Sequence, residues 1–162
     1  MMVVLGIDPG TAITGWGILD EQWEVKGFGC IKTKSVDSLP ERLKIIHREL
    51  KKVIALYKPD AAAIEEIFVA RNKQNTILVG EARGVAILAA AEEGIPVSEY
   101  SALQVKQALV GYGHAEKGQV QRMLKNILKL KEIPRPDDAA DALAVAMCHL
   151  NSQKMRRISG GI

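Results

Sequence analysis

The opening stretch, residues 3–11, limits the fold more than any other part of this 162-residue sequence. Its β-branched and aliphatic run over residues 3–7 predicts a strand buried on both faces, because such side chains fit a covered pleated surface. Pro9 and Gly10 end that strand at once. Asp8 is therefore expected at the tip of a core strand, either as a functional carboxylate or as the Asp of a tight turn.

Turn residues and hydrophobic periodicity divide the rest of the chain into short strands and helices. Two more strand-like runs joined by tight turns predict an antiparallel meander, and helical patterns that alternate with two further apolar runs predict crossovers to parallel strands. The expected strands are 3–7, 14–20, 24–32, 61–65 and 95–100, and the expected helices are 39–57, about 76–93, one opening at Ser101, 117 to about 130, and 138 to about 152. This order predicts an α/β fold whose five-stranded mixed sheet, three antiparallel strands plus two parallel, carries helices on both faces.

Composition is typical of one compact domain, with 48% hydrophobic and 25% charged residues. The sequence has no apolar run long enough to cross a bilayer and its start lacks the features of a signal peptide, so a cytoplasmic protein is expected. Cys30 and Cys148 have no second ligand at metal-binding spacing and are expected to be reduced structural thiols.

Basic residues gather toward the C-terminus. Residues 1–100 carry 12 Lys and Arg against 14 Asp and Glu, whereas residues 101–162 carry 10 against 5. Binding to a polyanion would explain this asymmetry, because Lys and Arg neutralise phosphates and release counterions. A solvated helix face explains it equally well.

Further carboxylates stand at the ends of predicted elements. Glu65 and Glu66 end the fourth strand, and only one of them can face Asp8 because successive strand side chains point in opposite directions. Asp138 and Asp141 lie three residues apart in the first turns of an otherwise apolar helix, where helix capping is the alternative to ligation. Four oxygen ligands without His or Cys select Mg²⁺ or Mn²⁺, and two such ions would serve phosphodiester hydrolysis. The acids therefore predict a nuclease.

Six segments, taken together and in order, give the sequence a resemblance to the RuvC family of Holliday junction resolvases. They are Leu5-Gly6-Ile7-Asp8-Pro9-Gly10, Ala63-Ile64-Glu65, Ala82-Arg83-Gly84-Val85-Ala86, Gln104-Val105-Lys106-Gln107, Ala115-Glu116-Lys117 and Asp138-Ala139-Ala140-Asp141-Ala142-Leu143-Ala144. The resemblance implies a ribonuclease H-like fold, a homodimer, and Mg²⁺-dependent cutting of four-way DNA junctions by paired symmetric nicks, in recombination and repair. It also implies two Mg²⁺ ions per subunit, replaceable by Mn²⁺, and a RuvA–RuvB branch-migration complex as a partner. It assigns catalysis and metal binding to Asp8, Glu65, Asp138 and Asp141.

DNA contacts are expected from two regions. Phe68 precedes a polar, basic run that includes Arg71 and Lys73, and its ring would stack on a base or, alternatively, belong to the core. Residues 101–135 hold seven basic residues against two acidic ones. Lys106, Lys117 and Arg122 are the candidates there, and the resemblance places the two lysines near the scissile phosphate or the DNA backbone.

Other functions share parts of this pattern. A YqgF-type relative acting on RNA has the same opening motif, as has a sugar-kinase or actin-like ATPase domain, which requires a longer chain. A non-catalytic DNA-binding dimer would use the first-turn acids only as caps. We expect residues 1–155 to form a single nuclease domain, residues 156–162 to form a flexible basic tail, and the small-residue helix around residues 80–91 to form the dimer interface.

Overall fold

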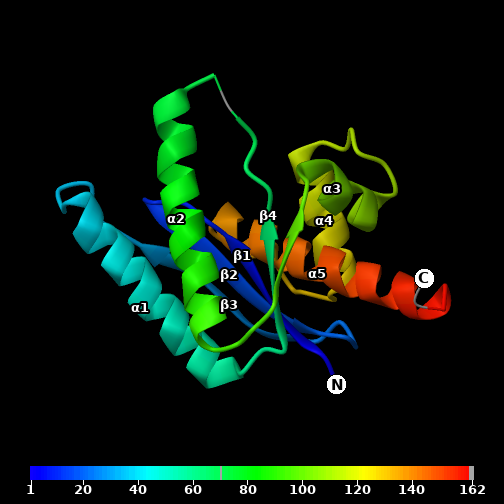
Figure 1. Ribbon diagram of the computed structural model, residues 1–162. Coiled ribbons are helices and arrows are strands. Elements are labelled where there is room, and N and C mark those ends of the chain that lie inside the picture. The colour runs from blue at the N-terminus through cyan, green and yellow to red at the C-terminus, as the bar shows by residue number, and fades with distance from the viewer. Residues whose placement is uncertain (70, 161–162) are drawn as a thin grey trace.

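The computed structural model describes residues 1–69 and 71–160 and consists of one sheet with helices on both faces (Figure 1). Its elements are β1 (Val3–Asp8), β2 (Ile13–Asp20), β3 (Val25–Lys32), α1 (Leu39–Tyr57), β4 (Ala61–Glu65), α2 (Lys73–Glu92), β5 (Val97–Tyr100), α3 (Ala102–Val110), α4 (Lys117–Ile127) and α5 (Asp137–Ile158).

The sheet has the strand order β3-β2-β1-β4-β5. β1 pairs with β2 and β2 with β3 in antiparallel directions, whereas β4 runs parallel to both β1 and β5. The predicted mixed sheet is therefore confirmed. Because Ile7 is the partner of Ile64, the next residues, Asp8 and Glu65, lie side by side at the carboxyl ends of two central strands.

Each face of the sheet has its own core. On one face Val4 and Ala63 pack against α5, with α3 and α4 beyond it; on the other face Leu5 and Ile64 pack against α1 and α2 (Figure 1). Alternation along the strands separates the two sets. Asp8 follows Val4 by four residues and Glu65 follows Ala63 by two, so both carboxylates belong to the face that α5 covers.

Strand glycines bring α5 unusually close to the sheet. A β-carbon added at Gly6 would lie 1.9 Å from the Ala142 carbonyl oxygen, and one at Gly15 would lie 2.0 Å from the Asp138 carbonyl oxygen. Any larger residue at these positions would push the helix away. Glycine in β1 and β2 thus allows the start of α5 to lie directly over the end of β1, next to Asp8.

Three predicted helix ends are wrong by a few residues. α2 begins at Lys73, not near Thr76, because the Asn72 side chain caps it by accepting from the Gln74 and Asn75 amides at 3.1 and 3.4 Å. α4 ends at Ile127, not near residue 130. α5 continues to Ile158, beyond the expected end near residue 152.

That longer α5 takes in residues 156–158 of the expected tail. Residues 161–162 of that tail lie outside the described residues. Within the described part of the chain, none of the helices combines the length and the apolar character that a membrane crossing requires.

Candidate active site

The site begins with Asp8 and the loop that follows it. The Thr14 hydroxyl donates to the Gly10 carbonyl at 2.7 Å and accepts from the Gly10 amide at 3.3 Å, which closes the loop on itself. The Thr11 hydroxyl donates to the Leu78 carbonyl at 2.9 Å and ties the same loop to α2. These bonds hold the end of β1 in a fixed position, and the half-buried Asp8 carboxyl with it.

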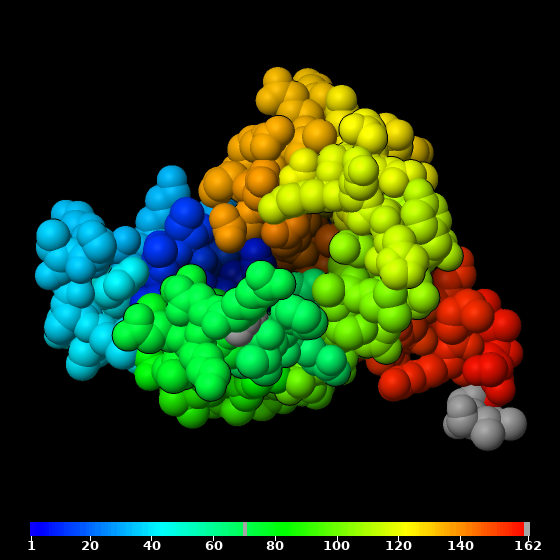
Figure 2. Space-filling model, turned by 90° about the horizontal axis from the view of Figure 1, so that it is seen from above, coloured from blue at the N-terminus to red at the C-terminus, as the bar shows by residue number. Residues whose placement is uncertain are grey.

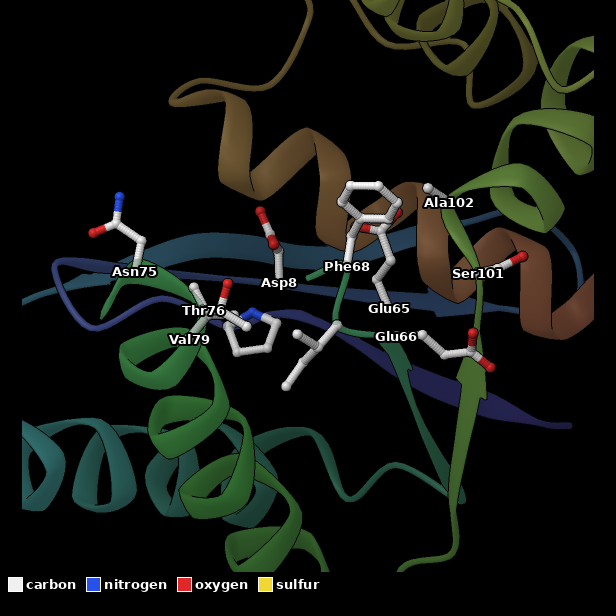
Figure 3. A pocket seen from close by; sticks show the side chains of 11 residues that line it. Asp8, Glu65, Glu66, Phe68, Asn75, Thr76, Val79, Ser101 and Ala102 are labelled. Atoms are coloured by element: carbon white, nitrogen blue, oxygen red, sulfur yellow. The ribbon is translucent and has the colours of Figure 1, made fainter. Parts of the chain in front are cut away.

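Glu65, not Glu66, is the glutamate that faces Asp8. In Figure 3 the Glu65 side chain rises beside Asp8, whereas Glu66 points away toward Ser101. The Glu66 amide donates to the Tyr100 carbonyl at 2.8 Å, which continues the pairing of β4 with β5 and fixes the direction of each side chain. The ambiguity that the sequence left open is thus resolved by strand alternation.

The helix α5 contributes the remaining two acids. Asp138 and Asp141 lie one helical turn apart and both are half-buried, while the helix is otherwise buried from residue 139 to residue 150. The Asp138 carboxyl is close enough to Asp8 to share a hydrogen bond. Asp137 at the start of the helix is instead ion-paired, at 2.8 Å with Arg135 and at 3.3 Å with Lys117.

Burial and like charge act together on these carboxyls. Burial, followed by the charges of Asp141, Asp138 and Glu65, raises the pKa of Asp8 from 3.8 to about 8. Burial and the Asp141 charge raise the pKa of Glu65, against the opposing effect of Lys106. The pKa of Asp141 is also raised, mainly by burial, although Lys117 opposes the shift. The four acids therefore form one electrostatically coupled group.

Two lysines border this group. Lys106 and Lys117 line a cavity of about 220 Å³ together with Glu65, Asp141 and Gln121. The Lys117 ammonium lies 3.8 Å from the Asp141 carboxylate. Burial alone would lower the pKa of Lys117, but the Asp141 and Asp137 carboxylates raise it. This lysine is therefore protonated and positively charged beside the acids.

The donor set suits a hard divalent cation. In their present positions, no three Asp, Glu, His or Cys side chains among residues 1–69 and 71–160 converge as ligands of one ion. The four carboxyls nevertheless offer only oxygen donors, which Mg²⁺ and Mn²⁺ prefer. The raised pKa values of Asp8, Glu65 and Asp141 reflect burial and, after it, mutual repulsion, and a bound cation would favour the ionised carboxylates against both. The residues present therefore fit the predicted metal.

The predicted DNA-contacting residues fall into two groups. Lys106 and Lys117 adjoin the acids, and Phe68, with 87% of its surface exposed, stands on the rim of the cleft, so it is not a core residue. Arg71, Lys73 and Arg122 are exposed on the surface and line neither of the two cavities at the acids. Figure 2 shows the hollow between the loop and helix around residues 65–80, the start of α5, and the α3–α4 region.

Cys30 is a neighbour of the site that the sequence did not indicate. It pairs with Gly15 in the sheet, and Gly15 pairs with Asp8, so the three residues lie in one row across β3, β2 and β1. Burial and the nearby Asp138 charge raise the pKa of the Cys30 thiol. Only the strand register reveals this position, because Cys30 lies 22 positions after Asp8 in the sequence.

A mixed sheet with four carboxyls at the carboxyl ends of its central strands and the facing helix defines an α/β protein of the ribonuclease H-like class. Comparison with known families narrows this class. The family profile described as "Crossover junction endodeoxyribonuclease RuvC" matches residues 4–149. The chain therefore belongs to the RuvC family, not to the YqgF-type or kinase-like alternatives.

Individual relatives agree with this assignment. The crossover junction endodeoxyribonuclease RuvC of Syntrophomonas wolfei is 56% identical over 157 residues, covering 95% of this chain and 91% of that protein. The structure of Thermus thermophilus RuvC in complex with Holliday junction substrate has a TM-score of 0.91 and 40% identity, with 96% of each chain covered. The yeast mitochondrial Holliday junction resolvase Ydc2 shares the fold, with a TM-score of 0.68 at 14% identity over 96% of this chain and 80% of that one.

Proposed function

We propose that this protein is an endonuclease that resolves four-way DNA junctions by paired symmetric nicks, in recombination and DNA repair. The observation that carries the proposal is the gathering of Asp8, Glu65, Asp138 and Asp141 into one coupled group, in a chain of the RuvC family. The likeness to Thermus thermophilus RuvC solved with a Holliday junction substrate supports the junction as substrate. Residues 1–155 would act as a single nuclease domain in the cytoplasm.

In this proposal the four acids hold Mg²⁺, or Mn²⁺ in its place, with two ions per subunit. When bound, such ions activate water and stabilise the leaving oxygen of an in-line phosphodiester displacement. Asp8 and Glu65 would hold them from the sheet and Asp138 and Asp141 from α5. Because α5 rests on strand glycines, the two pairs of ligands keep a fixed separation, which positions the attack.

The basic residues would bind the DNA backbone. Lys106 and Lys117 lie at the acids and would meet the phosphates nearest the cut, where cations also offset the charge that develops during hydrolysis. Arg71, Lys73 and Arg122 are exposed farther away and would contact phosphates along the junction arms. Phe68 would stack on a base at the junction.

A homodimer would give the two cuts that a two-fold symmetric junction requires. Two residues of the small-residue stretch of α2, Ala82 and Ala86, pack on the sheet of the same chain and are therefore not available for a dimer contact. Ile77, Gly84 and Leu88 remain exposed along one stripe of the helix, and we propose this stripe as the dimer contact. Family resemblance alone supports a RuvA–RuvB complex as a further partner.

The decisive experiment measures nicking of a synthetic four-way junction with and without Mg²⁺, with a linear duplex of the same sequence as control. The junction should be cut only with the metal, and the duplex should stay intact. Asp8→Asn should abolish cutting while junction binding survives or tightens, because a negative charge facing DNA is removed. Asp37→Asn, on the turn before α1, is the matched control and should cut normally. A nicking rate for Asp8→Asn within about tenfold of the parent would mean that Asp8 is not a metal ligand, whereas wild type that binds the junction but does not cut it would favour the non-catalytic DNA-binding dimer.

A further inference from the structure

A second cavity of about 260 Å³ opens beside the acids, and neither Lys106 nor Lys117 lines it. Its lining comes from the end of β1, the loop after β4, the start of α2 and the start of α3 (Figure 3). The two cavities share Glu65 and Ala102, so a strand of DNA that passes Glu65 can reach both of them.

The two cavities differ in charge. The lysine-lined cavity presents Lys106 and Lys117 beside Glu65 and Asp141, so a phosphate finds two cationic partners there. None of the described residues that line the second cavity is Lys or Arg, and three of them are the carboxylates Asp8, Glu65 and Glu66. Apart from a cation held by Asp8 and Glu65, the described lining offers a phosphate no positive partner. The part of the second cavity away from these two acids therefore suits an uncharged group.

The shape and chemistry of the second cavity suit a flat heterocycle. Its walls include the apolar side chains of Pro9, Ile67 and Val79, and the exposed Phe68 ring stands over it. Polar groups occur only around this apolar surface. Glu66 and Ser101 lie on one side of the cavity and Asn75 lies on the opposite side (Figure 3). An aromatic ring with a few polar groups around an apolar pocket is the usual arrangement for reading an extruded base.

We propose that this cavity receives one nucleobase next to the cleaved phosphate, and that Glu66 and Asn75 determine which base is accepted. The inference rests on the proposed function and adds a specificity site to it. An ionised carboxylate only accepts hydrogen bonds, so Glu66 favours a base that presents an amino group, whereas the Asn75 amide both donates and accepts. Glu65 separates the base from its phosphate, which lies on the side of Lys106.

The first test measures cutting rates on junctions that carry each of the four bases at the two nucleotides flanking the cut. Wild type should distinguish the best base from the worst by about tenfold or more at one of these nucleotides. Glu66→Gln and Asn75→Ala should reduce that ratio to about threefold or less and leave the other nucleotide unaffected. Glu132→Gln, an exposed glutamate outside the cleft, is the control and should keep the ratio. Unchanged ratios in both variants would overturn the proposal.

A second test needs no cutting. The fluorescent base 2-aminopurine is placed at each flanking nucleotide in turn, and its emission is followed on binding without metal, because extrusion from the stack increases it. Emission should rise at one nucleotide with wild type, and Val79→Phe, which fills the cavity, should remove the rise. Should Val79→Phe fail to fold, Glu66→Gln supplies the comparison. If wild type cuts no junction, the proposed function fails, yet a rise confined to one nucleotide still supports the cavity and no rise at either nucleotide overturns it.

Discussion

Replacing Asp8 by Asn should stabilise the metal-free protein. The pKa of Asp8 is raised from 3.8 to about 8 in the folded state, so the folded protein binds this proton more tightly than the unfolded chain does. Above both pKa values the carboxyl is ionised in the folded and in the unfolded state, and the free energy of unfolding is lowered by the full amount. Below pH 3.8 it is not lowered. Between these limits the free energy of unfolding of wild type falls by up to about 1.4 kcal/mol per pH unit, or roughly 4 kcal/mol by pH 7.

The amide of Asn does not titrate, so the free energy of unfolding of the variant does not fall with pH in this way. At about 2–4 °C per kcal/mol for a chain of this size, Asp8→Asn should melt roughly 10 °C above wild type at pH 7 in EDTA. The difference should shrink toward pH 4 and level off above pH 8. Thermal melts from pH 4 to pH 9 measure this directly, and Asp37→Asn should follow wild type throughout.

Addition of Mg²⁺ gives the complementary measurement. The cation should raise the melting temperature of wild type, because it binds the folded protein and neutralises the acids, and should raise that of Asp8→Asn much less. The reasoning is refuted if Asp8→Asn is no more stable than wild type at pH 7 to 8 in EDTA, or if its advantage does not change with pH. Either result would mean that burial and the neighbouring acids do not disfavour the ionised Asp8 carboxyl in the folded state.

Five further variants test separate parts of the structure. Asp141→Asn should lower the nicking rate at least about a hundredfold, while the junction affinity measured without metal is kept or increases. Lys106→Ala should lower the slope of log affinity against log salt by about one, whereas Phe68→Ala should weaken binding by about 1–3 kcal/mol with the slope intact. Gly15→Ala should displace α5, destabilise the fold by about 1–3 kcal/mol in denaturant melts, and reduce cutting. Leu88→Glu should give a monomer by sedimentation if the α2 stripe is the dimer contact.

The sequence predicted the sheet well because local signals were sufficient. All five strands lie where apolar runs end at turn residues, and the change from tight turns to crossover helices gave the strand directions. The Ser101 and Gln104 capping box at the start of α3 was also readable, since both halves of it lie within four residues. Errors occurred at helix ends such as that of α2, where the Asn72 cap stood inside a polar run and gave no distinct signal.

The site required information that no local pattern holds. Which glutamate faces Asp8 depends on the register of β4 against β1, and Cys30 becomes a neighbour only through the pairing of three strands. The sequence predicted that Lys117 contacts DNA, but not that it pairs with Asp137 and Asp141. Those ion pairs form only because α4 packs against α5. Long-range packing decides these contacts, and spacing along the chain does not.

The ion pairs of Lys117 connect metal binding to DNA binding. Without a divalent cation, Asp141 has this lysine as its nearby positive charge, at 3.8 Å. A cation held by Asp141 would weaken that attraction, so that the ammonium, still paired with Asp137 at 3.3 Å, could also meet a phosphate. The acids repel DNA until they are neutralised, so the same ion would both reduce that repulsion and release a phosphate-binding group. Junction binding to wild type should therefore tighten when a non-hydrolysing divalent cation such as Ca²⁺ is added, and this gain should be smaller in Lys117→Ala.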